Sequence, residues 1–313
     1  MTDSVVLCEC FARDGLQHEP EFLPTSTKVE LLGRFVDAGF TRIEASSYSH
    51  PSRIPAFSDV RDVLLAAPRK PGVSYKATCP NPKGVERALQ DYEIGTAADE
   101  LSLLVSASES HSQRNLRSTR DQQWQRVQEM AALADGRFAL VGVVSVAFGC
   151  PFEGWVDPDV VVADVARFAE CGARFVTIGD TTGVAHPRTT KELFARLLRE
   201  FPQLTVVAHF HNTRGTGIAN AVAALEAGVR HFDSAMGGVG GHPSSIHYGA
   251  GLTGNVCTED LVSLFEAMGV DTGIDPENLR TASAACEAAL KRPLHSMVAR
   301  TDFARTPKEP TNV

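Results

Sequence analysis

Short apolar runs alternate with amphipathic stretches along nearly the whole chain. Eight runs have the length and composition of buried β-strands, and they cover residues 5–10, 41–45, 73–77, 100–105, 139–144, 174–178, 204–209 and 230–233. The stretches between them carry apolar side chains at helical spacing, as over residues 27–37, 121–134, 159–171, 190–200 and 218–227. Gly39, Gly172 and Gly228 each follow a predicted helix and precede a strand, which is where helices commonly end on glycine.

Repeated strand–helix units with apolar strands predict a parallel sheet covered by helices. Eight such units can close into a (β/α)8 TIM barrel, for which 313 residues is an ordinary length. An open doubly wound sheet is the alternative, but it would need a glycine-rich phosphate loop after the first strand, and residues 10–15 do not form one. We expect one α/β catalytic domain over residues 1–313, with the TIM barrel over about 4–270 and extra C-terminal helices over about 271–305.

Composition and charge narrow the functional classes. The formal net charge of -8 argues against a nucleic-acid surface, and no apolar run reaches the length of a membrane span. The first residues lack the basic and apolar pattern of a secretory signal. Seven cysteines without paired zinc-type spacing favour reduced thiols. We therefore expect a cytoplasmic protein that acts on a small molecule.

The clearest chemical signal is the segment His209-Phe210-His211-Asn212 at the end of an apolar run. Side chains alternate along a strand, so His209 and His211 point to the same side and can bind one metal ion. A strand that buries two histidines for packing alone would be unusual. Imidazoles combined with oxygen ligands suit Mg²⁺ or Mn²⁺ better than a closed tetrahedral zinc site.

Other polar residues gather where the predicted strands end. They are Arg13, Asp14, Glu44, Asp180, Thr181, Thr182 and the loop from Gly237 to His242, which continues to Asn255. Chemistry in a barrel occurs at the carboxyl ends of its strands, so these residues are expected on one rim. For residues 180–182, capping of the next helix is an equally good interpretation.

Five motifs occur in order along the chain, and together they resemble 3-hydroxy-3-methylglutaryl-CoA lyase, a member of a superfamily of metal-dependent TIM-barrel lyases and aldolases. The motifs are RDGLQ at 13–17, IEASS at 43–47, GCPFEG at 149–154, GDTTG at 179–183 and HFHN at 209–212. The resemblance spans roughly residues 5–275 and includes Gly254-Asn255.

The resemblance implies a divalent cation held by Asp14, His209, His211 and Asn255. It implies a retro-Claisen cleavage of a 3-hydroxy-3-substituted acyl-CoA into an acyl-CoA and a keto acid or ketone. The resemblance also implies that Arg13 binds the substrate and stabilises the enolate oxygen, and that Glu44 lies near the metal. Asp180 would lie near the group that acts as the base, and His209 would take part in catalysis. Gln17 and Thr182 would contact the substrate. Arg13 suits an oxyanion because its charge is permanent and its donors are fixed.

One departure from the family pattern concerns the loop after the eighth strand. Where the family has a cysteine that takes part in proton transfer, this chain has His242, and residues 246–248 look inserted. Histidine can do similar work because its pKa lies near neutrality, and a role as an ordinary loop residue is the alternative.

Several functional alternatives share the same metal site. They are a Claisen-type condensation, a 4-hydroxy-2-oxo acid aldolase and a non-catalytic barrel. The partners expected from the resemblance are an acyl-CoA substrate and a second copy of the chain in a homodimer. Arg53, Lys83 and Arg114 are candidates for binding the CoA phosphates, with ordinary solvated side chains as the alternative.

Overall fold

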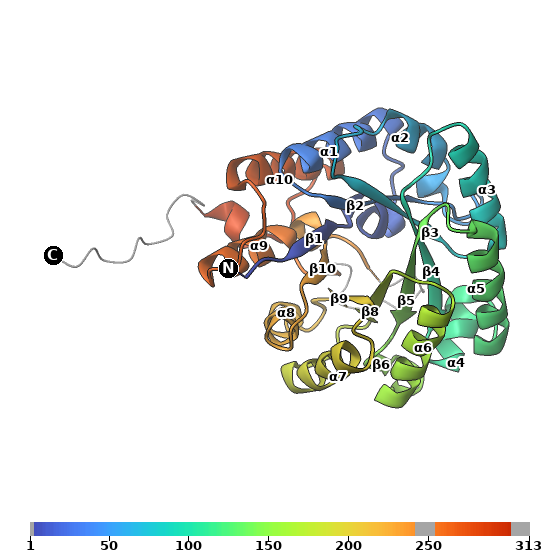
Figure 1. Cartoon of the computed structure of the whole chain (residues 1–313). Helices are drawn as coiled ribbons and strands as arrows, with labels where there is room; N and C mark the ends of the chain where they lie inside the picture. The colour runs from blue at the N-terminus through green and yellow to red at the C-terminus, as the bar shows by residue number, and fades with distance from the viewer. Residues whose placement is uncertain (1–2, 242–253, 302–313) are drawn as a thin grey trace.

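The structure, a computed structural model, describes residues 3–241 and 254–301. A closed barrel of parallel strands lies at its centre, in the order β1-β10-β9-β8-β5-β4-β3-β2, with helices around the outside (Figure 1). The barrel closes because β1 pairs with both β10 and β2. The predicted TIM barrel is therefore confirmed.

All of the strands predicted from the apolar runs are present, with ends shifted by no more than two residues. They are β1 (Val6–Glu9), β2 (Arg42–Ser47), β3 (Ser74–Cys79), β4 (Glu100–Ser106), β5 (Ala139–Ser145), β8 (Phe175–Asp180), β9 (Thr205–Phe210) and β10 (His231–Ser234). A short antiparallel pair, β6 (Gly149–Cys150) and β7 (Gly154–Trp155), follows β5 and was not predicted.

The helices follow the predicted spacing. They are α1 (Thr25–Asp37), α2 (Val60–Ala66), α3 (Pro82–Glu93), α4 (Glu109–His111), α5 (Arg120–Ala134), α6 (Pro158–Glu170), α7 (Pro187–Glu200), α8 (Gly217–Glu226), α9 (Thr258–Ala267) and α10 (Pro276–Leu290). Gly39, Gly172 and Gly228 have φ angles of 104°, 78° and 107°, as expected for glycines at helix ends. Within the described ranges, no helix is both long and apolar enough to cross a membrane.

The last long helix, α10, confirms the additional helical layer. It lies beside α1 at the outside of the barrel (Figure 1). The Asn278 side chain donates to the Asp37 carbonyl at 3.0 Å, and the Asp275 amide donates to the Ala38 carbonyl at 2.9 Å. These contacts join the C-terminal extension to the end of the first barrel helix.

The amino-terminal half of the barrel interior is filled. Val141, Phe175 and Val207 form a buried cluster there. Arg42 binds Glu100 at 2.7 Å, and its guanidinium group lies 4.1 Å from the centre of the Phe175 ring. This packing fills the amino-terminal end of the barrel, so among the described residues the barrel interior is open to a ligand at the carboxyl ends of the strands.

Candidate metal and active site at the carboxyl ends of the strands

A cavity of about 160 Å³ opens at the carboxyl ends of the barrel strands. Six of the residues to which the family resemblance assigns a role line it: Arg13, Asp14, Gln17, Glu44, His209 and His211. They come from three strand ends, β1, β2 and β9, and the turns that follow them. The structure therefore brings together most of the predicted site, in the region where TIM-barrel sites occur.

The two histidines lie on the same side of the end of β9, as predicted. Their Nε2 atoms are 3.1 Å apart. When two nitrogens occupy neighbouring coordination positions of one metal ion, each about 2.1 Å from it, they lie about 3 Å apart. The observed distance therefore fits two histidines that bind the same ion. Burial, together with the neighbouring His209, lowers the pKa of His211 to about 4, which keeps it a neutral imidazole at physiological pH.

Asp14 faces the histidines from a π-helical turn, Phe11–Gly15, directly after β1. Its Oδ2 lies 3.7 Å from His211 Nε2, and candidate ligand atoms of Asp14, His209 and His211 all lie within 4.8 Å of one another. Burial by itself would raise the pKa of Asp14, but Arg13 and the two histidines lower it to about 2. The side chain is thus an anionic ligand at neutral pH.

Asn255 completes the group with an oxygen that has no hydrogen-bond donor. Its Nδ2 donates to Asp14 Oδ2 at 2.7 Å and to the Val239 carbonyl at 2.9 Å, while its buried Oδ1 has no partner among the described residues. The close approach depends on Gly240, whose φ is 128° and where a Cβ would lie 2.4 Å from Asn255 Nδ2. Two imidazoles, a carboxylate and an unpaired amide oxygen are a donor set that fits a divalent cation.

Arg13 lies between two carboxylates beside these four residues. Its Nη1 donates to Asp14 Oδ1 at 2.6 Å, and its Nε is 3.4 Å from Glu44 Oε1. Glu44 is itself held by the Thr78 hydroxyl, which donates to it at 2.8 Å. Arg13 therefore presents a fixed guanidinium group to the cavity.

Two buried charged residues of this site, Lys76 and Asp233, were not predicted from the sequence. Lys76 Nζ lies 3.3 Å from Asp233 Oδ2 and 3.8 Å from Glu44 Oε2, and the same Asp233 oxygen lies 3.4 Å from His209 Nδ1. Asp233 thus orients a candidate ligand, as carboxylates behind metal-binding histidines do. The sequence feature that could have identified this pair is Lys76, a charged residue inside the apolar run at 73–77.

Asp180 and Thr182 do not reach the cavity. Gly179 and Thr181 line it instead, and because side chains alternate along β8, the intervening positions face the helical layer. Asp180 accepts hydrogen bonds from the Val184 and Ala185 amides at 2.9 and 3.1 Å.

Thr182 donates to the Gly149 carbonyl at 3.0 Å. Both side chains thus bind backbone groups outside the cavity lining, and neither caps the next helix, α7, whose N-cap is His186. Burial raises the pKa of Asp180 to about 6.

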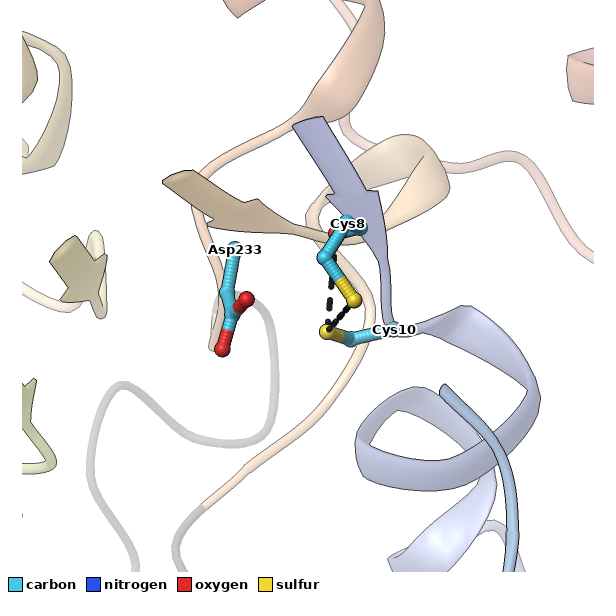
Figure 2. Close-up of side chains that lie close together, drawn as sticks. All are labelled: Cys8, Cys10 and Asp233. Atoms are coloured by element: carbon cyan, nitrogen blue, oxygen red, sulfur yellow. Dashed lines mark hydrogen bonds between the residues drawn. The ribbon is translucent and has the colours of Figure 1, made fainter. Parts of the chain in front are cut away.

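A second group of possible ligands lies behind the histidines. Cys8 and Cys10 project from the same side of β1 toward Asp233, and their sulfur atoms are 3.9 Å apart (Figure 2). Burial raises the pKa of Cys10, and the ammonium group of Lys76 already neutralises the nearby carboxylate. A protonated Cys10 thiol beside a fixed cation disfavours a second metal ion there.

His242 and residues 246–248, which we expect to be an insertion, lie outside the described residues, so their placement relative to this site stays a prediction.

Together, the fold and the site define a class: a TIM-barrel protein with a candidate divalent-metal centre at the carboxyl ends of its strands. Within this class, the chain belongs to the HMGL-like family, whose family model matches residues 4–286.

Characterised relatives and solved structures resemble almost the whole chain. Mitochondrial hydroxymethylglutaryl-CoA lyase of Bos taurus is 35% identical over 298 residues, which cover 95% of this chain and 89% of that protein. (R)-citramalyl-CoA lyase of Chloroflexus aurantiacus is also 35% identical, over 319 residues that cover 95% of each. The structure of an HMG-CoA lyase from Acinetobacter baumannii in complex with coenzyme A and 3-methylmalate is 36% identical, has a TM-score of 0.88 and matches 99% of this chain and 97% of that one.

Proposed function

We propose that this protein is a divalent-metal-dependent carbon–carbon lyase that cleaves a 3-hydroxy-3-substituted acyl-CoA into an acyl-CoA and a keto acid or ketone. The observation that carries the proposal is the convergence of Asp14, His209 and His211 beside Arg13 in one cavity, with Asn255 hydrogen-bonded to Asp14 and its own amide oxygen unpaired among the described residues. The two types of CoA lyase among the relatives support a CoA thioester as substrate.

The site residues have distinct roles in a retro-Claisen cleavage. A bound Mg²⁺ or Mn²⁺ would polarise substrate oxygens and acidify the 3-hydroxyl group. Once that hydroxyl loses its proton, its oxygen forms a carbonyl, the bond between C2 and C3 breaks, and the electron pair passes into the thioester enolate. Arg13 stabilises the enolate oxygen, because its guanidinium group is held in place by Asp14 and Glu44. The carbanion carbon then takes up a proton to give the acyl-CoA.

A basic groove adjoining the catalytic cavity suits the phosphates of CoA. It has a volume of about 660 Å³ and shares Ser49, Ile54 and Asn115 with the cavity. Its basic lining residues are Arg53, Lys83, Arg87, Arg117 and Arg126, and no carboxylate lines it in the described part of the chain. Of the phosphate candidates from the sequence, Arg53 and Lys83 lie in this groove, whereas Arg114 lines a neighbouring one that also contains Glu19 and Glu21.

Two parts of the proposal depend on features that the described residues do not include. His242 would transfer the proton to the enolate carbon in place of the family's loop cysteine. A homodimer in the cytoplasm would be the working form of the enzyme, and light scattering that gives a monomer mass at micromolar concentration would contradict the dimer.

The decisive experiment measures cleavage of hydroxymethylglutaryl-CoA and citramalyl-CoA before and after chelation. Activity should disappear with a chelator and return with Mg²⁺ or Mn²⁺. Supplying acyl-CoA with a keto acid tests condensation, and a 4-hydroxy-2-oxo acid without a thioester tests the aldolase alternative. Full activity in a verified metal-free preparation, or cleavage of the thioester-free substrate alone, would contradict the proposal.

A further inference from the structure

Glu9 is a buried carboxyl group near the candidate metal centre that the proposed mechanism does not use. It stands on β1 between Cys8 and Cys10, which point toward Asp233 (Figure 2). Because side chains alternate along a strand, Glu9 points the opposite way, and it is not among the described residues that line the catalytic cavity. The residue is 0% exposed, so it can influence the site only through the groups that it binds.

The Glu9 carboxyl group joins three segments of the chain. Its Oε1 accepts hydrogen bonds from the Phe11 amide at 2.8 Å and from the Met236 amide at 3.0 Å. Its Oε2 lies 2.7 Å from the Thr258 hydroxyl, which in turn lies 2.8 Å from the Ser234 hydroxyl. One side chain thus connects the end of β1, the turn after β10 and the start of α9.

Each of these segments leads to a candidate metal ligand or to a group that holds one. Phe11 begins the π-helical turn that contains Asp14, and Thr258 follows closely after Asn255. The turn after β10 supplies the Val239 carbonyl, which accepts a hydrogen bond from Asn255 Nδ2 at 2.9 Å. The relative position of Asp14 and Asn255 therefore depends on how the three segments are held together.

We infer that Glu9 is a positioning residue for the metal centre, because its three hydrogen bonds fix the segments that carry Asp14 and Asn255 relative to one another. This inference rests on the proposed function for the presence of a divalent ion at those two residues. The Phe11 and Met236 amides are buried, so an apolar side chain at position 9 would leave both without their acceptor.

A neutral amide can replace the Glu9 carboxyl group. Burial raises the pKa of Glu9 to about 8, although the hydrogen bonds with Thr258, Phe11 and Met236 act in the opposite direction. A glutamine Oε1 would accept from the same two amides, and its Nε2 would donate to the Thr258 hydroxyl oxygen, which can direct its own proton to Ser234. Glu9→Gln therefore keeps all three connections and removes only the titratable group.

The test is the Mn²⁺ affinity of folded variants in the absence of substrate, measured by equilibrium titration. Glu9→Met has similar length but no hydrogen-bonding oxygen, and it should weaken Mn²⁺ binding by about 10- to 100-fold, the cost typical of losing a residue that supports a ligand. Glu9→Gln should stay within about threefold of the wild type. Thr258→Val removes one connection and should weaken binding by about 3- to 10-fold, so it provides the test if Glu9→Met does not fold.

Asp164 provides the matched control for the loss of a buried carboxylate. It is 1% exposed and accepts hydrogen bonds from Arg120 and Trp124 between α5 and α6, and none of the three is among the described residues that line the cavity. Asp164→Leu should lower the free energy of unfolding, as Glu9→Met should, but Mn²⁺ affinity should stay within about threefold of the wild type. Denaturant unfolding of both variants thus separates lost stability from lost positioning.

The outcomes separate the role of Glu9 from the lyase proposal. Unchanged Mn²⁺ affinity in Glu9→Met, or in Thr258→Val if Glu9→Met does not fold, would overturn the positioning role and leave metal-dependent thioester cleavage untouched. An equal loss in Glu9→Gln or in Asp164→Leu would also overturn it, because charge or general stability would then be the cause. Glu9-dependent Mn²⁺ affinity in a protein that cleaves no thioester would support the positioning role and contradict the proposed function. A wild-type protein that binds no Mn²⁺ would contradict both.

Discussion

Asp14 and Asp180 occupy similar positions in the sequence but very different ones in the barrel. Each is located at or shortly after the carboxyl end of a strand, and each is buried. Asp14 lines the cavity beside Arg13 and the histidines, which lower its pKa to about 2. Asp180 binds two backbone amides behind the cavity wall, and burial raises its pKa to about 6. One carboxylate is available to a ligand, and the other holds a turn.

The difference follows from the direction of the side chain. Gly179 and Thr181 occupy the cavity-facing positions around Asp180, so the strand period sends Asp180 outward. Asp14 lies in a π-helical turn instead, where the strand period no longer applies. A polar residue at a strand end therefore belongs to a barrel site only when the local backbone turns it inward.

The largest effect expected from this comparison is on metal binding. Asp14→Asn should weaken Mn²⁺ binding by more than about 100-fold, because loss of a ligand should exceed the 10- to 100-fold cost of losing a supporting residue. Asp180→Asn is the matched control and should bind Mn²⁺ within about threefold of the wild type. Equilibrium titration with Mn²⁺ measures both, and similar losses in the two variants would remove the distinction.

The next largest effect should be on the turnover number of the enzyme when Arg13, the neighbour of Asp14, is changed. Arg13→Lys should lower kcat by about 100-fold or more, because lysine keeps the charge but loses the planar donors that address an oxyanion. Mn²⁺ affinity and the circular dichroism spectrum should remain close to those of the wild type. A change in kcat within a factor of two would show that Arg13 does not stabilise the transition state.

The fold was predictable because its signals are local and repeated. Apolar strand runs, helical spacing and glycines such as Gly39 and Gly228 recur often enough to define a closed barrel. The short β6–β7 pair escaped prediction because two-residue strands carry no periodicity.

The site was predictable only in part. The histidine pair follows from the strand period, and Asp14 and Asn255 follow from the family resemblance. Lys76 and Asp233 were missed because their pairing joins residues 157 positions apart, which no local pattern reports. Asp180 and Thr182 were misplaced because the motif identifies the segment and not the direction of each side chain.

A smaller effect should appear in the pH dependence of stability. Because the pKa of Asp180 is raised from its usual 3.8 to about 6, its contribution to stability is fully present below pH 3.8 and is lost as the pH rises through 6. The stability advantage of the wild type over Asp180→Asn should therefore shrink by up to about 3 kcal/mol between pH 4 and pH 7. Denaturant unfolding of both proteins at several pH values measures the difference. A gap that stays constant would mean that Asp180 titrates normally.

The smallest effect compares Gln17 and Thr182, the two residues that the sequence placed at the substrate. Gln17 lines the cavity, whereas Thr182 binds the Gly149 carbonyl behind the wall. Gln17→Ala should raise KM by about 3- to 30-fold at nearly constant kcat, as expected for a lost contact made equally in the ground state and the transition state. Thr182→Val should leave KM within about twofold and instead lower the unfolding free energy by about 1 kcal/mol, because it leaves a buried carbonyl without its donor. Steady-state kinetics and denaturant unfolding on the same preparations separate the two outcomes. A KM change confined to Thr182→Val would mean that the turn after β8, and not Gln17, contacts the substrate.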